Sequence, residues 1–374
     1  MAHPGTSAAY AAGVSQALQS QPRPRGRVPQ ISGSASGPFG TATGVLVGGY
    51  VGLVDAAPFL ACERKGFFEK HSVQVSLQRE IGWATVRDRL VSGELDFAHA
   101  PAGLVAASSS GVGCVATSCV GLIEVNRNGN AITLSKEACR YSEHGGLAAW
   151  AKATGRSLVF AVPSWVSSHA WIIARWLRES GLEIGRHVQL VVVPPMQMVA
   201  NLAAGHLDGF CVGEPWNSLA VRQRKGWVAA FSSRIVPGHS EKVLMVTRER
   251  LERDPDIFLR LASALSESCR YCEEKHNREE VAVILAETFG GRFDRELVRK
   301  SLVGPFPDGN ARQQVERFHW FTGSWMDLEA QRVAAEVELQ CRSWDALGRL
   351  PAARRLQFLE SCFSPGLRNQ TQSI

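Results

Sequence analysis

The chain has 374 residues, of which 45% are hydrophobic and 20% are charged, enough for about two domains with cores of their own. The net charge is +6, and the basic side chains are dispersed, without the run of about five or six like charges that marks a nucleic-acid-binding tail. Nine cysteines at irregular spacing do not form the pattern of a disulfide framework and favour a reducing compartment. A small disulfide-stapled scaffold is therefore excluded, and direct nucleic-acid binding is not expected.

The N-terminal region lacks the pattern of a targeting or membrane segment. Residues 1–42 are rich in Ala, Gly, Ser, Gln and Pro and contain no apolar run of a secretory signal. The uncharged stretch 37–54 is interrupted by glycines and is too polar to span a bilayer, and the first Arg-Arg pair is Arg354-Arg355, far from where an export signal would need it. We predict disordered tails over 1–42 and 366–374, no membrane association and a cytoplasmic location.

From Val45 onward, short apolar runs alternate with amphipathic stretches, which is typical of a parallel sheet covered by helices. The first unit is predicted to be β-α-β-α-β, with strands over 45–54, 73–78 and 95–100 and helices over 57–70 and 83–92. The alternation restarts after Gly155, with strands over 157–162, 188–193 and 207–212 and helices over 168–180 and 196–204. A further strand over 242–247 precedes helical patterns over 255–275, 278–289, 294–302 and 310–327.

Two successive α/β units of this size predict a two-lobed α/β fold with a ligand cleft between the lobes. We assign residues 43–150 and 238–365 to the first lobe and 151–237 to the second, so that the chain crosses between them twice. Ligands of open α/β sheets bind beyond the carboxyl ends of the strands. The loops that follow strands in both lobes are therefore expected to form the site.

No catalytic or nucleotide-binding signature is present, so an enzyme is not expected. Cys269, Cys272 and His276 are the one group with metal-ligand residue types, but a zinc site usually needs a second pair of ligands at matching spacing. The spacing of three and four residues instead predicts one helix face packed on the core. No metal is expected.

Four residues stand out because they lie at the ends of predicted elements. Trp83 and His169 fall at helix starts, His169 in a first turn that Ser167 or Ser168 would cap and whose free amides favour anions. Gly213 ends a strand and lets a backbone N–H approach a ligand closely. Lys242 begins the strand that returns to the first lobe. Taken singly, Trp83 is also compatible with packing at a helix start, His169 and Lys242 with solvated surface positions, and Gly213 with a plain turn after a strand.

Together these segments resemble the NrtA/CmpA-type nitrate- and bicarbonate-binding family, whose members have the type II periplasmic-binding fold. The resemblance covers about residues 45–365. It is carried by Gly52-Leu53-Val54-Asp55-Ala56-Ala57-Pro58, by Asn128-Gly129-Asn130-Ala131-Ile132-Thr133-Leu134-Ser135, by the helix from Ser168-His169 to Trp176-Leu177, by Phe210-Cys211-Val212-Gly213-Glu214-Pro215-Trp216-Asn217 and by Glu241-Lys242-Val243-Leu244.

The resemblance implies that Trp83, Asn130, His169, Gly213 and Lys242 hold one small anion in the cleft, without a cofactor. Nitrate is planar and monovalent, so a selective site needs one or two cationic donors and several neutral ones. The five residues supply one ammonium group and neutral donors around it. A lysine at position 242 favours nitrate or nitrite, while its neighbour Glu241 leaves bicarbonate open, since bicarbonate receptors use an acidic group and a calcium ion there.

The amino-terminal composition resembles the cytoplasmic NasS-type nitrate/nitrite sensors rather than the transport receptors. That resemblance implies a protein partner, an RNA-binding antitermination regulator that is released when the anion binds. Two alternatives remain: a substrate-binding protein of a nitrate importer, and an enzyme on the same fold such as a thiamine-pyrimidine biosynthesis protein. The enzyme would need a reactive His or Cys set in the cleft, and Cys211 is instead predicted to be buried in a strand.

Overall fold

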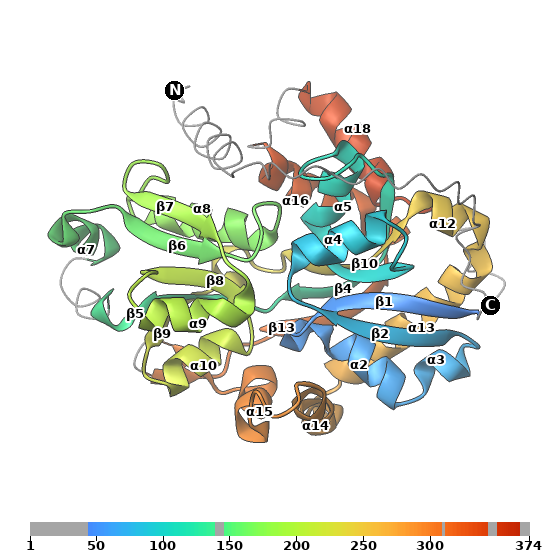
Figure 1. Ribbon diagram of the computed structural model, residues 1–374, viewed down its shortest axis with the longest axis horizontal. Coiled ribbons are helices and arrows are strands. Elements are labelled where there is room, and N and C mark those ends of the chain that lie inside the picture. Colours follow the sequence, from blue (N-terminus) through green and yellow to red (C-terminus); the bar gives the residue numbers. More distant parts are fainter. Residues whose placement is uncertain (1–43, 139–145, 309–310, 343–349, 367–374) are drawn as a thin grey trace, which may run out of the picture.

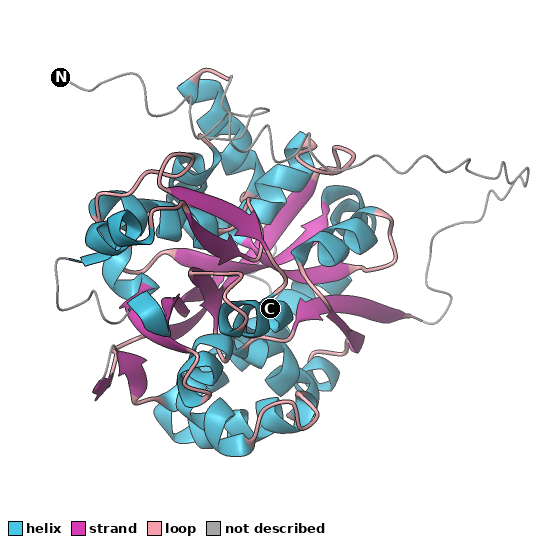
Figure 2. Ribbon diagram, turned by 60° about the vertical axis from the view of Figure 1, so that its left-hand side comes forward, coloured by secondary structure: helices cyan, strands magenta, loops and turns pink. Residues whose placement is uncertain are grey.

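The computed structural model describes residues 44–138, 146–308, 311–342 and 350–366. The tails predicted over 1–42 and 366–374 lie outside these residues, except for Gly366. The described chain forms two α/β lobes side by side, each with its own mixed sheet (Figure 1). Helices surround the sheets (Figure 2). The predicted two-lobed architecture is confirmed.

The first lobe is built on a six-stranded sheet of order β13-β4-β10-β3-β1-β2. β1 pairs in parallel with β2 and β3, and β10 lies antiparallel between β3 and β4. Its strands are β1 (Val45–Val51), β2 (Gln74–Glu80), β3 (Phe97–Pro101), β4 (Cys119–Asn128), β10 (Ser240–Thr247) and β13 (His319–Trp325). Its helices are η1 (Val54–Ala56), α2 (Ala57–Arg64), α3 (Phe67–Lys70), α4 (Trp83–Val91), α5 (Ala102–Ser110), α12 (Arg248–Arg253), α13 (Pro255–Glu273), η2 (Lys275–Asn277), α14 (Arg278–Thr288), α15 (Arg295–Val303), α16 (Met326–Cys341) and α18 (Ala352–Cys362).

The second lobe repeats this order in a five-stranded sheet, β7-β6-β8-β5-β9. Here β5 is the antiparallel strand, placed between β8 and β9. The strands are β5 (Asn130–Ser135), β6 (Leu158–Val162), β7 (Val188–Val192), β8 (Gly209–Gly213) and β9 (Gly226–Phe231). The helices are α7 (Gly146–Thr154), α8 (Ser168–Glu179), α9 (Pro195–Ala203), α10 (Trp216–Arg222) and α11 (Ser232–Ile235). A hairpin of β11 (Phe306–Asp308) and β12 (Ala311–Gln313) packs on this lobe through Phe306, which contacts Phe231.

The first crossing between the lobes lies at a different residue from the predicted one. β5 begins at Asn130 and pairs with strands of the second lobe, so the chain crosses at Gly129 and not at the predicted boundary of 150/151. The predicted helix over 310–327 is also wrong, because most of this range forms β12 and β13. In β13 buried and half-buried positions alternate from His319 onward, which is the period of a strand and not of a helix.

Asn128 ties the two crossing segments together at the hinge. Its φ of 60° and the φ of 93° at Gly129 turn the chain sharply between β4 and β5. The Asn128 backbone N–H donates to the carbonyl of His239 over 3.1 Å, and its side-chain Oδ1 accepts from the Gly238 N–H over 3.0 Å. The outgoing and returning segments therefore lie side by side.

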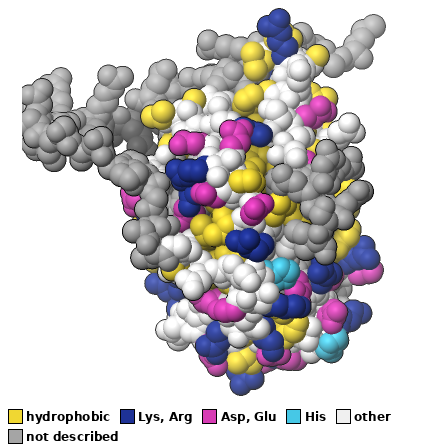
Figure 3. Space-filling model, turned by 90° about the vertical axis from the view of Figure 1, so that its right-hand side faces the viewer, with side chains coloured by type: hydrophobic (Ala, Val, Ile, Leu, Met, Phe, Trp, Pro, Cys, Tyr) yellow, Lys and Arg dark blue, Asp and Glu magenta, His cyan; other side chains and the backbone are white. Residues whose placement is uncertain are grey.

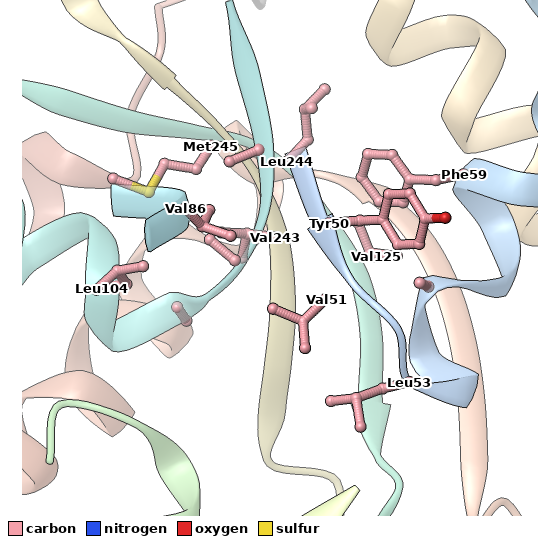
Figure 4. Close-up of a cluster of buried hydrophobic side chains, with 14 of the residues drawn as sticks. Tyr50, Val51, Leu53, Phe59, Val86, Leu104, Val125, Val243, Leu244 and Met245 are labelled. Atoms are coloured by element: carbon pink, nitrogen blue, oxygen red, sulfur yellow. The ribbon is translucent and has the colours of Figure 1, made fainter. Parts of the chain in front are cut away.

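A continuous apolar core lies under the first sheet. Figure 4 shows Val243, Leu244 and Met245 of β10 among side chains from β1 and the helices beside it. All three are fully buried, as expected for a central strand covered on both faces. On the surface seen in Figure 3, basic and acidic side chains are interspersed and no single-sign patch forms. No helix among the described residues is long and apolar enough to cross a membrane.

Candidate functional site

A cluster of buried polar side chains lies where the two lobes meet. It is assembled from η1, β3, the start of β5, the end of β8, the start of β10 with the residue before it, and the first turns of α4 and α8. We call it the inner cluster, and its members are Asp55, Trp83, His99, Asn130, Ser168, His169, Gly213, His239, Glu241 and Lys242. Every side chain in it is at most 4% exposed. Such burial of polar groups is costly unless they bind one another or a ligand.

Lys242 is the cation of the inner cluster, and two carboxylates hold it. Its Nζ lies 2.8 Å from Asp55 Oδ2 and also pairs with Glu241. Burial would lower the pKa of Lys242, but the two carboxylates outweigh burial and raise it. Lys242 is therefore charged and already neutralised from the first lobe.

Glu241 connects the first lobe to the second. Its Oε2 accepts a hydrogen bond from Asn130 Nδ2 over 2.7 Å and one from the Ser168 hydroxyl. His169 Nε2 lies 3.7 Å from Glu241 Oε1. Burial opposes ionisation of Glu241, yet Lys242 and the neighbouring histidines lower its pKa to about 2. An ionised Glu241 thus draws donors of the second lobe onto the first.

The histidines of the cluster are neutral because they are buried. Burial lowers the pKa of His169 to about 4, and it lowers the pKa of His99 and His239 as well. Burial also raises the pKa of Asp55, against the effect of Lys242. With both carboxylates ionised, the cluster carries one positive and two negative charges.

Aromatic rings form the remaining wall of the inner cluster. Lys242 Nζ lies 5.3 Å from the centre of the Trp83 ring, close enough for a cation–π contact. The His99 ring packs edge-on against Trp83, with 5.9 Å between ring centres, and 5.1 Å from Phe59. These rings exclude water and strengthen the electrostatic interactions among the charged groups.

Within the part of the chain that the structure describes, several buried polar atoms of the cluster have no hydrogen-bond partner. They are Trp83 Nε1, Asp55 Oδ1, Asn130 Oδ1, His239 Nε2 and both ring nitrogens of His99 and His169. Native structures leave few such atoms, and each needs an explanation, such as a ligand. Gly213 faces the same place, because a Cβ there would lie 3.5 Å from Asn130 Oδ1 and 3.6 Å from Asp55 Oδ2. The arrangement offers donors on several sides to one small acceptor molecule.

The structure brings all five sequence-predicted residues, Trp83, Asn130, His169, Gly213 and Lys242, into this one cluster. The predicted helix cap differs: Ser167 Oγ donates to the Ser164 carbonyl, and Ser168 binds Glu241 instead of capping the helix.

Sequence reasoning missed the roles of Asp55, His99, Ser168 and His239. Asp55 could have been found, because it directly follows the strand predicted over 45–54, and the segment after a strand is where a ligand is expected. His99 lies inside β3, where all five positions are buried, so its pattern is that of a core residue. The position of Ser168 before a helix predicts only a cap, and His239 lies in the crossing segment that gives no periodic signal.

The cysteine–histidine group does not form a metal site. Cys269 and Cys272 are buried in α13, as predicted, whereas His276 lies beyond the helix with its side chain 76% exposed. Among the described residues, no three His, Cys, Asp or Glu side chains are grouped as a metal ion would need.

Two α/β lobes with a buried polar cluster between them are the architecture of the periplasmic-binding-protein fold. Residues 44–286 match the model of the NMT1-like family, and the chain belongs to this family. The resemblance to NrtA/CmpA-type proteins is thereby confirmed. The chain is 36% identical to the nitrate import ATP-binding protein NrtC of Synechocystis sp. over 270 residues, 70% of this chain and 40% of that protein.

Other relatives support the same placement. The nitrate/nitrite binding protein NrtA of Synechococcus elongatus is 29% identical over 303 residues, 76% of this chain and 67% of that protein. The bicarbonate transport ATP-binding protein CmpC of the same species is 36% identical over 305 residues, 79% of this chain and 44% of that protein. The chain thus spans less than half the length of the ATP-binding relatives.

Solved structures agree on the fold. The periplasmic nitrate-binding protein NrtA of Synechocystis superposes with a TM-score of 0.80 at 24% identity, covering 88% of this chain and 89% of that one. The sulfonate-binding protein SsuA of Escherichia coli superposes with a TM-score of 0.56 at 15% identity, covering 79% and 85%. These similarities establish the periplasmic-binding-protein fold.

Proposed function

We propose that this chain binds nitrate or nitrite in the inner cluster and does not catalyse a reaction. The observation that carries the proposal is the set of buried donors without partners, contributed by both lobes around Lys242. Nitrate only accepts hydrogen bonds, and Trp83, the two histidine rings and the ammonium group each have a proton to donate. The names of relatives such as NrtA support the same ligand class.

The chemistry of the cluster supports binding over catalysis. The one cysteine beside it, Cys211, lies in β8, and burial raises the pKa of its thiol well above the ordinary value. A thiolate nucleophile is therefore not available at neutral pH. Ser168 donates its proton to Glu241 while His169 lies 3.7 Å from the same carboxylate, which is not the serine–histidine contact of a nucleophile and its base.

Bicarbonate is the second candidate, favoured by two buried acceptors. Asp55 Oδ1 and Asn130 Oδ1 have no donor, and a bicarbonate hydroxyl could donate to either, whereas nitrate cannot. Relatives named as bicarbonate transport proteins support this alternative. A thermal-shift panel separates the two: nitrate or nitrite should raise the melting temperature with concentration, as a ligand of the native state does. A shift with bicarbonate that needs calcium would select the second candidate.

We further propose that the chain acts as a cytoplasmic sensor whose ligand releases an RNA-binding antitermination regulator. The eight cysteines within the described residues are all free thiols, which supports a reducing compartment. Contacts across the lobes through Glu241 give the anion a closed state to stabilise. The runner-up is a substrate-binding protein of a nitrate importer, which the transport names of the relatives favour.

Gel filtration of the chain with a candidate regulator tests the sensor role. The complex should dissociate when nitrate or nitrite is added, and reciprocity requires the regulator to weaken anion binding by the same factor. A complex that is equally stable with and without the anions, or an unchanged anion affinity, would refute the sensor role. The binding proposal would then stand alone and favour the importer.

A further inference from the structure

A second feature of the lobe interface lies outside the inner cluster. An open hollow of about 360 Å³ is lined by both lobes, and we call it the outer hollow. The residues used below are Gly52, Arg79, Met196, Trp216, Phe289 and Arg292. Met196 and Trp216 belong to the second lobe and the other four to the first.

The outer hollow shares its loops with the inner cluster. Gly52 lies three residues before Asp55, and Trp216 lies three residues after Gly213. The third shared loop joins Arg79 at the end of β2 to Trp83. The outer hollow is therefore the solvent-facing end of the interface that buries the cluster.

Two arginine side chains that line the outer hollow form no ion pair with any described residue. Within the described residues, the guanidinium groups of Arg79 and Arg292 have no hydrogen bond or ion pair. Glu80 is the only carboxylate among the lining residues, and it forms an ion pair with Arg89. The hollow thus presents two positive charges that nothing in its lining neutralises.

The Arg79 guanidinium is positioned against the wall of the hollow. A Cβ at Gly52 would lie 2.6 Å from Arg79 Nε, so the group rests directly on the Gly52 backbone. Its other side faces the Phe289 ring, 5.6 Å from the ring centre. Burial lowers the pKa of Arg79, and the nearby Arg292 charge acts in the same direction, so an anion between the two would relieve their repulsion.

The charge of the inner cluster makes such a site useful. Lys242 is already neutralised there by Asp55 and Glu241, so the cluster presents no net positive charge to an approaching anion. The two arginines of the hollow supply the attraction that the cluster lacks, since charged grooves raise association rates.

We propose that the outer hollow is a second anion-binding site, which captures a nitrate-sized oxyanion between Arg79 and Arg292 before it passes to the inner cluster. This site rests on the proposed function of the inner cluster. Divalent oxyanions such as sulfate should also occupy it, because two guanidinium groups favour a second negative charge.

The test measures nitrate association by stopped-flow tryptophan fluorescence in wild type and in an Arg79→Gln/Arg292→Gln variant. At about 10 mM salt, where screening is weak, the association rate constant should fall about tenfold in the variant. At about 1 M salt the two proteins should agree within about twofold. At constant ionic strength, replacing chloride by sulfate should slow association in wild type but not in the variant.

An Arg178→Gln/Arg186→Gln variant is the matched control. It removes the same charge from exposed positions near the end of α8 and before β7, at the edge of the second sheet away from the hollow, and should associate like wild type. Equal rate constants in all three proteins, or equal losses in both variants, would overturn the outer site while leaving the inner one intact. If wild type shows no nitrate binding at equilibrium, the proposed function fails and the outer site fails with it.

Discussion

Lys242 is predicted to be essential for stability as well as for the ligand. Replacing it by methionine leaves Asp55 and Glu241 as two uncompensated carboxylates in a site that is at most 4% exposed. Loss of one partner of a buried ion pair costs about 3–5 kcal/mol. The pKa of Glu241 gives a similar figure, since its fall from 4.5 to about 2 corresponds to about 3 kcal/mol of preference for the ionised form.

A second substitution should restore much of this loss. In Lys242→Met/Asp55→Asn, Glu241 keeps its hydrogen bonds from Asn130 and Ser168, so one buried charge remains and it is solvated by donors. We expect the double variant to regain about 2 kcal/mol of the free energy of unfolding relative to Lys242→Met. Urea unfolding followed by tryptophan fluorescence measures both values through the midpoint at constant slope.

Lys70→Met is the matched control for this experiment. Lys70 also pairs with a carboxylate, Glu267, but its side chain is 63% exposed, and such pairs contribute about 0–1 kcal/mol. The reasoning is refuted if Lys242→Met costs no more than Lys70→Met, or if adding Asp55→Asn makes the protein less stable still. Either result would mean that the inner cluster does not hold three coupled charges.

Three further predictions follow from the interface and the buried histidines. Gly103→Ala should weaken nitrate binding about tenfold by blocking lobe closure, because a Cβ at Gly103 would lie 2.2 Å from the Val166 carbonyl of the other lobe. Gly121→Ala, where the nearest contact of an added Cβ is 3.4 Å, should leave nitrate affinity unchanged, and nitrate titrations of both variants measure the difference. Nitrate affinity should rise as pH falls, because a bound anion raises the pKa of His169 from about 4, so that binding is accompanied by proton uptake. Calorimetry in buffers of different ionisation enthalpy measures this uptake, and His169→Gln should abolish the pH dependence. Absence of proton uptake would contradict the prediction. The free energy of unfolding should fall as pH drops from about 6.5 to about 4, because in this range His169 and His319, with pKa values of about 4 and about 3, protonate only in the unfolded chain. Urea midpoints that did not change between these pH values would contradict this prediction.

Much of the fold could be predicted because periodicity and chain order are local signals. The alternation of strands and helices over both units gave most parallel strands to within a few residues. The antiparallel strand β5 was not predicted, since 130–135 precedes the start of the periodic pattern of its lobe and its partners lie about eighty residues away. The helix expected over 310–327 failed because a short alternating run was taken for a helical one.

The inner cluster was predictable in part for a similar reason. Gly213 and Lys242 lie at strand ends, where a ligand of an open sheet is expected, and the structure places them at the same interface. The pairing of Lys242 with Asp55 depends on β1 and β10 meeting in one sheet, which local patterns do not encode. The sequence therefore indicated the cation but not that two carboxylates neutralise it.

Calorimetric titration of the purified chain with nitrate and nitrite, with and without a chelator, tests the central claim most directly. We predict binding at about micromolar level that the chelator leaves unchanged and that His169→Gln weakens at least about tenfold, since loss of a charged hydrogen bond costs about 1.5–3 kcal/mol. His169 has no hydrogen-bond partner in the structure, so this substitution breaks no bond of the fold. Absence of heat with both anions, or binding of bicarbonate that requires calcium, would contradict the claim.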